Sequence, residues 1–163
     1  MKIAIGADHG GFELKKNIIA SFTGAEFIDV GCTGPEACDF PDYADAVAEK
    51  VTLGEVDFGV LVCRTGMGMT MAANRFQNVR AALCSTTETA TLTRQHNGAN
   101  VLCLIADAVS PAYALEIVRT FVSTPVDMSE RHVRRRWKLE RAQRLSDCSG
   151  LMHDDPEDRK SVV

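Results

Sequence analysis

Short apolar runs alternate with segments of helical periodicity along the chain. Residues 2–7 form the first run, and apolar side chains then recur at roughly helical spacing from Phe12 to Phe22. The same alternation predicts strands near 26–30, 57–63, 80–84 and 100–104, and helices near 42–53, 69–76, 86–96 and 110–122. The pattern therefore predicts five strands that alternate with helices.

The composition of these strands indicates how they are packed. They are rich in Val, Ile, Leu and Ala without strict polar alternation, which is typical of strands buried on both faces. A parallel sheet covered by helices buries its strands in this way, so we predict an α/β fold, a three-layer α/β/α sandwich. Residues 129–145 predict an extra C-terminal helix whose arginine-rich face cannot belong to the core.

Length and composition predict a single domain. The chain has 163 residues, and we expect one domain over 1–146 and a flexible C-terminal tail over 147–163. No stretch approaches the roughly 20 continuous apolar residues that span a bilayer, and the N-terminus lacks a signal peptide's apolar segment. We therefore expect a cytoplasmic protein with no membrane association.

The cysteines and histidines favour neither disulfides nor a metal. The six cysteines include no CxxC pair and no regular framework spacing, which favours reduced thiols. The four histidines form no H-x3-5-H pair beside close cysteines, so a structural metal is not expected.

The charge is unevenly distributed. The net charge is −4, yet residues 131–144 contain seven basic residues and one acidic residue, Glu140, so the rest of the chain is acidic. This distribution disfavours nucleic-acid binding by the body of the protein. It leaves open an anion site in the C-terminal cluster.

Candidate chemical groups follow the predicted strands. Ligands of open parallel sheets bind beyond the carboxyl ends of the strands. Three such ends are unusual: Asp8-His9-Gly10-Gly11 after the first strand, the loop at 63–68 after the third, and Asp107 after the fifth. A further group, His96-Asn97, lies in the turn that enters the fifth strand.

Cys63 is a candidate nucleophile or base. It ends an apolar run and precedes a glycine-containing loop that opens a helix, where backbone amides favour a negative group such as a thiolate. The alternative is a small buried hydrophobic residue. The loop itself is no P-loop, since the chain has no Gly-Lys pair, and Met71 replaces the third glycine of a dinucleotide fingerprint. A phosphatase loop would need an arginine where Met69 stands.

The other candidates each have a structural alternative. Asp8 could cap a helix beside an exposed His9, and His96 could be a late helix residue near a C-terminus. Arg131 and Arg135 are four residues apart and share one helix face, which is either a solvated basic surface or a phosphate site.

Together, these residues resemble the ribose-5-phosphate isomerase type B family, which includes the galactose-6-phosphate isomerase subunits. The similarity extends from residue 1 to about residue 144. The motifs that carry it are the segments 5–12, 39–44, 59–63, 72–75, 79–84 and 94–97.

The resemblance implies a Rossmann-like fold, no metal or organic cofactor, and active sites between two subunits of a dimer, which can pair into a tetramer. It implies interconversion of ribose 5-phosphate and ribulose 5-phosphate through a cis-enediolate, with Cys63 as the base and His96 opening the furanose ring. Asn97 and the amides of 64–68 would hold the enediolate oxygen. The remaining implied site residues are Asp8 and His9 for the sugar end, Arg131 and Arg135 for the phosphate, and Arg64, Thr65, Gly66, Met67 and Gly68 in the loop.

Two positions depart from that family's pattern. Arg64 stands where the family usually has glycine, and Asp107 stands where it usually has an arginine that holds phosphate. We hypothesise that the changes are linked, with Arg64 either replacing the lost positive charge or pairing with Asp107.

Alternative functions are isomerisation of another sugar, a hexose 6-phosphate or an unphosphorylated sugar, and a non-catalytic subunit of a hetero-oligomer. Nucleic-acid binding through 131–144 is disfavoured because Trp137 is the only aromatic residue there.

Overall fold

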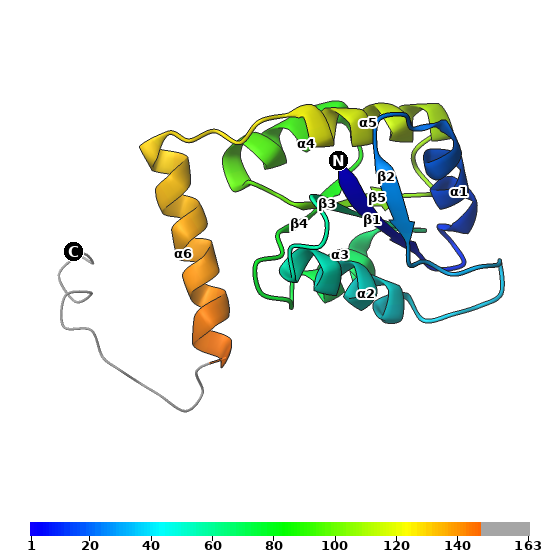
Figure 1. The fold of residues 1–163 in the computed structure, drawn as a ribbon, viewed down its shortest axis with the longest axis horizontal. Coiled ribbons are helices and arrows are strands. Elements are labelled where there is room, and N and C mark those ends of the chain that lie inside the picture. Colours follow the sequence, from blue (N-terminus) through cyan, green and yellow to red (C-terminus); the bar gives the residue numbers. More distant parts are fainter. Residues whose placement is uncertain (148–163) are drawn as a thin grey trace.

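A parallel five-stranded sheet forms the centre of the molecule. The computed structural model describes residues 1–147, and the strands follow the order β2-β1-β3-β5-β4 with every neighbouring pair parallel (Figure 1). Their bounds are Lys2–Ala7 for β1, Glu26–Asp29 for β2, Phe58–Cys63 for β3, Ala81–Cys84 for β4 and Val101–Ile105 for β5. The predicted strands are confirmed to within one residue at each end.

Helices cover both faces of this sheet. They are α1 (Phe12–Ser21), α2 (Phe40–Thr52), α3 (Met67–Ala73), α4 (Thr87–Leu92) and α5 (Pro111–Ser123). A further helix, α6 (Glu130–Asp147), covers neither face. One core cluster joins the sheet to α1, α4 and α5, and the other joins it to α2 and α3. Figure 1 shows these helices on opposite sides of the strands, which confirms the three-layer sandwich.

Alternate residues of each strand enter the two cores. In β1, Ile3 and Ile5 pack toward α1 and α5, whereas Ala4 packs toward α2. Gly6 follows on the α2 side, where an added Cβ would lie 3.0 Å from the backbone oxygen of Tyr43. The period of two along a strand explains this alternation, and both sets are apolar because both faces are covered.

Two helices begin earlier than predicted. We predicted α2 from residue 42 and α3 from residue 69, but they begin at Phe40 and Met67. Pro41 fits the first turn of α2 because its fixed φ suits a helix and its missing N–H has no partner there. Gly66 precedes α3 with φ of 71°, and this left-handed conformation lets the chain turn directly from β3 into the helix.

The helix predicted over 86–96 is divided into two parts. α4 is capped by the Thr86 hydroxyl and ends at Leu92, and a π-helical turn, η1, then covers Thr93–Asn97. Within this turn, Arg94 lies over the Phe58 and Phe121 rings, 4.9 and 5.5 Å from their centroids. Its guanidinium also donates to the backbone oxygens of Ala99 and Thr124.

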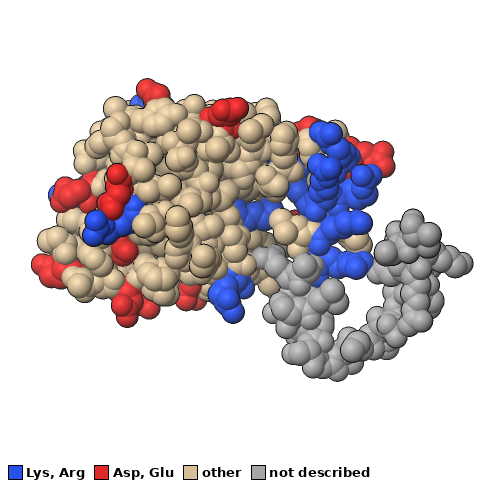
Figure 2. Space-filling model, turned by 180° about the vertical axis from the view of Figure 1, so that it is seen from behind, with Lys and Arg blue, Asp and Glu red and all other residues tan. Residues whose placement is uncertain are grey.

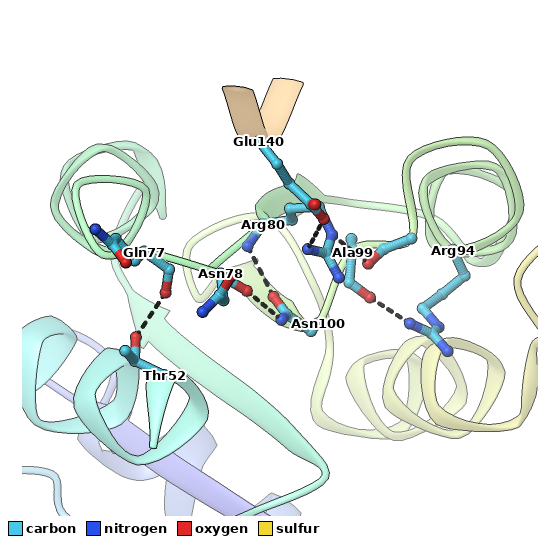
Figure 3. A network of polar contacts seen from close by, with 9 residues as sticks. Thr52, Gln77, Asn78, Arg80, Arg94, Ala99, Asn100 and Glu140 are labelled. Carbon is cyan, nitrogen blue, oxygen red and sulfur yellow. Dashed lines mark hydrogen bonds and ion pairs between the residues drawn. The ribbon is translucent and has the colours of Figure 1, made fainter. Parts of the chain in front are cut away.

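α6 runs beside the sandwich rather than within it (Figure 1). It begins one residue later than predicted and extends to Asp147, and the predicted tail beyond that residue lies outside the described residues. Glu140 on α6 pairs with Arg80 of the body at 3.0 Å, and Figure 3 shows this pair bridging the two. Arg80 also donates to the Gly98 carbonyl at 2.8 Å. Burial lowers the pKa of Arg80, and the neighbouring Glu140 opposes that shift.

Within residues 1–147, no helix has the length and apolar character needed to cross a membrane.

Candidate active site in two parts

The first group of candidate residues surrounds Cys63 at the carboxyl end of β3. The Cys63 side chain is buried, and its sulfur accepts a hydrogen bond from the Gly66 backbone N–H at 3.0 Å. This contact confirms the expected approach of loop amides to the thiol. A Cβ at Gly66 would overlap Leu83 and lie 3.0 Å from the Leu104 backbone oxygen, so glycine is required for this geometry.

The rest of the loop is held by short local contacts. The Thr70 hydroxyl donates to the Gly66 backbone oxygen at 2.7 Å, and the Met67 amide donates to the Thr65 hydroxyl at 3.5 Å. Gly68 faces the Phe40 ring, where an added Cβ would lie 2.7 Å from the ring edge. The loop therefore has a defined shape, with Thr65 and Met67 exposed on its surface.

Asp8 and His9 lie next to this loop, at the end of β1. The buried Asp8 carboxylate accepts a hydrogen bond from the Gly11 amide at 3.0 Å. Gly11 is itself the N-cap of α1, which has no side-chain cap, so the helix-capping alternative for Asp8 is wrong. The exposed His9 ring accepts at Nδ1 from the Cys38 amide at 3.3 Å. Because Nδ1 acts as an acceptor, Nε2 carries the proton of the neutral ring and can donate to a ligand.

Arg64 and Asp107 form an ion pair across the same edge of the sheet. Arg64 Nε lies 3.1 Å from Asp107 Oδ2, and the Asp107 amide donates to the Arg64 carbonyl at 3.2 Å. The aliphatic part of Arg64 covers Gly10, where an added Cβ would overlap Arg64 Cγ and lie 3.1 Å from Cδ. The hypothesis that the two unusual residues pair with each other is therefore confirmed as a contact.

This pair predicts a small but measurable coupling. A double-mutant cycle with Arg64→Met and Asp107→Asn should give a coupling free energy of about 0.2–1 kcal/mol in urea unfolding, because both side chains are exposed to water. The Lys16–Glu13 pair, at 3.6 Å and similarly exposed, is the control and should show less coupling. Strict additivity at Arg64 and Asp107 would contradict the pairing.

The second group of candidate residues surrounds His96 in η1. The exposed His96 ring stacks on the ring of His132 from α6, with centroids 4.5 Å apart and an interplanar angle of 28°. Arg131 Nη2 lies 3.3 Å from His132 Nε2, and the exposed Arg135 follows one turn later on α6. Lys and Arg side chains gather over α6 at one end of the molecule (Figure 2).

The two groups lie at opposite ends of the strands, one at the carboxyl ends and the other at the amino ends. Cys63 pairs with Ile105 at the carboxyl end of β5, whereas His96 and Asn97 precede Val101 at its amino end. The five residues of β5 separate these ends by about 13 Å at ~3.3 Å per residue. A single chain therefore does not bring Cys63 and His96 together around one small ligand.

Sequence reasoning missed His132 and Asp127. The His132 side chain is buried, and its Nδ1 lies 2.8 Å from Asp127 Oδ2. The sequence did contain a pattern that indicates this contact, because His132, Arg136 and Glu140 recur every four residues. In the structure these three residues form the face of α6 that meets the body. The equally spaced Arg131 and Arg135 obscured it.

Two other cysteines of the described residues, Cys84 and Cys103, lack the surroundings of a reactive thiol. Burial raises the pKa of Cys84 to about 11 and that of Cys103 to about 12, so both remain protonated at neutral pH. Across residues 1–147, no three His, Cys, Asp or Glu side chains are arranged to hold a metal ion. The expectation of no metal and no cofactor stays a prediction.

The structure is a parallel α/β sandwich in which the buried Cys63 thiol lies at the carboxyl ends of the strands, where such folds bind their ligands. Residues 3–139 match the sequence profile of the family described as Ribose/Galactose Isomerase. The chain belongs to this family.

Individual relatives agree with the family match. The chain is 47% identical to ribose-5-phosphate isomerase B of Escherichia coli over 119 residues, 72% of this chain and 80% of that protein. The ribose 5-phosphate isomerase structure from Thermotoga maritima has a TM-score of 0.83 and 44% identity, covering 86% of this chain and 97% of that one. For the ribose-5-phosphate isomerase B of Clostridium thermocellum the TM-score is 0.85 at 40% identity, with 90% and 99% covered.

Proposed function

We propose that this chain is an aldose–ketose isomerase that interconverts ribose 5-phosphate and ribulose 5-phosphate. Its family and its relatives named as ribose 5-phosphate isomerases support this reaction. The structural observation that carries the proposal is the buried Cys63 thiol, which accepts a hydrogen bond from a loop amide at the ligand-binding edge of the sheet.

The proposed chemistry has two proton-transfer stages. In the first, the His96 imidazole moves the proton of the anomeric hydroxyl to the ring oxygen, which opens the furanose to the aldehyde. In the second, the Cys63 thiolate removes the proton from C2, giving a cis-enediolate, and returns it to C1. The O2 hydroxyl proton passes to O1, so the product is the ketose and both catalytic groups are regenerated.

Hydrogen-bond donors stabilise the enediolate. The proton beside a carbonyl is weakly acidic, so its removal requires donors directed at the oxygen on which charge develops. In the proposal, the amides of 64–68 and the Asn97 side chain supply these donors. Thr65 lies in the same loop, and its hydroxyl accepts from the Met67 amide.

The substrate's ends are bound by separate groups. Asp8 and His9 would bind the sugar hydroxyls, and His9 presents a donor nitrogen at the same edge as Cys63. Arg131 and Arg135 would bind the phosphate, because guanidinium groups hold phosphate oxygens with paired charge-assisted hydrogen bonds. Arg64 would line the site beside Cys63 while paired with Asp107.

The positions of Cys63 and His96 support a site shared between two copies of the chain. In a twofold dimer, the Cys63 edge of one copy would meet the His96 edge of the other, forming two equivalent sites. Both parts carry exposed apolar side chains suited to such an interface: Phe40, Met67 and Met71 beside the Cys63 loop, and Val133, Trp137 and Leu139 on α6. We therefore propose a homodimer as the smallest active assembly.

Mixing two inactive variants tests this arrangement. Cys63→Ala and His96→Ala should each be inactive as homodimers. In a mixed dimer one site regains both residues, so unfolding and refolding a 1:1 mixture together should restore about a quarter of wild-type activity. Each variant refolded alone is the control. Absence of recovery despite mixed-dimer formation would contradict the shared site.

The substrate is tested separately from the assembly. Exchange of the C2 proton in deuterated water should be detected with ribose 5-phosphate, and a panel of hexose 6-phosphates and unphosphorylated sugars tests the alternatives. Exchange with another sugar instead would show that the proposed substrate is wrong and that the proposed type of reaction is right. Tight sugar-phosphate binding without any exchange would favour a non-catalytic subunit.

A cytoplasmic location stays a prediction from the sequence.

A further inference from the structure

His132 occupies a position between two groups that the proposed reaction uses. Its ring stacks on His96 at 4.5 Å, and its Nε2 lies 3.3 Å from Arg131 Nη2. Its Nδ1 lies 2.8 Å from Asp127 Oδ2 and 3.3 Å from the Ser129 hydroxyl. Only 3% of the side chain is exposed, so these contacts are largely shielded from water.

The neighbours of His132 determine its protonation state. The Asp127 carboxylate only accepts hydrogen bonds, so the facing Nδ1 must carry a proton. The Arg131 guanidinium only donates, so the facing Nε2 must present its lone pair. A neutral imidazole protonated at Nδ1 satisfies both requirements. A proton on Nε2 would point at a cation and break the contact with Arg131.

Asp127 is itself firmly held. Its backbone amide donates to the Gln95 carbonyl at 3.0 Å, which ties it to η1. Its Oδ1 accepts from the Ser129 amide at 2.7 Å. Hydrogen bonds from the Ser129 backbone and from His132 lower the pKa of Asp127 to about 2, so the carboxylate is ionised at neutral pH. Asp127 thus provides a fixed negative acceptor for His132.

We propose that His132 is a positioning residue that, oriented by Asp127, holds the His96 ring and the Arg131 guanidinium in place for the reaction. This inference rests on the roles of His96 and Arg131 in the proposed function. His132 touches no reacting atom in this mechanism. It acts by stacking on the group that opens the sugar ring and by accepting a hydrogen bond from the group that binds phosphate.

Asp127→Asn is the most informative substitution. Oδ1 accepts from the Ser129 amide, so the carboxamide oxygen must remain there and its NH₂ group must face His132 Nδ1. His132 would then be protonated at Nε2, toward Arg131. The affinity for inorganic phosphate, measured by calorimetry on the full chain, should fall about fivefold because a charge-assisted contact is lost.

Glu130→Gln is the matched control. Glu130 is the first residue of α6, the helix that carries His132. Its side chain is exposed, and its Oε1 lies 3.9 Å from Arg134 Nη1. Both substitutions remove one negative charge near the arginines, which by charge alone would strengthen phosphate binding. Glu130→Gln should therefore bind phosphate as well as wild type or more tightly, whereas Asp127→Asn should bind it more weakly. Equal or tighter binding by Asp127→Asn would overturn the proposal.

A spectroscopic measurement tests the protonation state directly. The ¹⁵N resonances of His132 should show a protonated Nδ1 and an unprotonated Nε2 in the wild type, and the reverse in Asp127→Asn. Neither this measurement nor phosphate binding requires turnover. Both therefore test the role of His132 even if the chain does not isomerise ribose 5-phosphate. A wild-type His132 protonated at Nε2, or at both nitrogens, would overturn the assignment.

Two substitutions of His132 separate its two contacts. His132→Phe retains a ring against His96 but loses both nitrogens, so KM for ribose 5-phosphate should rise about fivefold with kcat little changed. His132→Leu loses the stacked ring as well and should also lower kcat. Equal kinetics for the two variants, each folded by circular dichroism, would contradict the role of the ring.

Discussion

Replacing Cys63 with alanine is expected to lower kcat for ribose 5-phosphate isomerisation by about 10³-fold, since a positioned general base contributes ~10² to 10⁴. The variant loses the group that moves the C2 proton and leaves the Gly66 amide without its sulfur acceptor. The fold should persist because one buried sulfur is removed from an intact core. Proton exchange at C2 in deuterated water measures the loss even when turnover is slow.

Cys103→Ala is the matched control for this substitution. Cys103 lies on the neighbouring strand β5, in the same core cluster as Cys63, and is fully buried. Its thiol has a pKa raised to about 12 by burial and takes no part in the mechanism. Cys103→Ala should lose some stability but retain exchange. Undiminished exchange by Cys63→Ala would remove Cys63 as the base.

Gly11→Ala is expected to destabilise the fold by about 3 kcal/mol or more, because overpacking against backbone is not easily relieved. Gly11 is the N-cap residue of α1 and lies against β3, and an added Cβ would overlap the Val62 carbonyl oxygen and lie 3.0 Å from the Cys63 nitrogen. Both atoms belong to a central strand paired on both sides. Urea unfolding monitored by circular dichroism measures the loss.

Gly34→Ala separates backbone overlap from overlap with a mobile side chain. A Cβ at Gly34 would also overlap a neighbour, but that neighbour is the terminal carboxylate of Glu36, which is exposed and can rotate away. Its cost should be below about 1 kcal/mol. Similar losses at Gly11 and Gly34 would show that β3 yields at Val62 and would contradict the steric argument.

The strands were predictable because burial on both faces makes them short apolar runs. Such a run ends where the polar edge of the sheet begins, as at Cys63 and Arg64, so the predicted ends are accurate. Helix ends depend on local chemistry that periodicity does not record. α3 begins at Met67 because Gly66 adopts a left-handed conformation, a feature that no hydrophobic pattern indicates.

Part of the site was predictable in the same way. The approach of an amide to Cys63 follows from a cysteine placed between a strand and a helix. The contact of Arg64 with Asp107 follows from two strand ends that are neighbours in the sheet. The contacts of α6 were not predictable, because His132 lies in a segment where arginines occupy nearly every face. Only the docked position of that helix selects one face over another.

The π-helical turn at 93–97 places one extra residue in the chain directly before β5. A π turn contains one residue more than an α turn over nearly the same rotation of the chain. Deleting one residue within this turn should therefore let α4 continue as an ordinary helix while the residues after the deletion keep their direction. The π turn is thus a local allowance in chain length, which the elements on either side of it do not register.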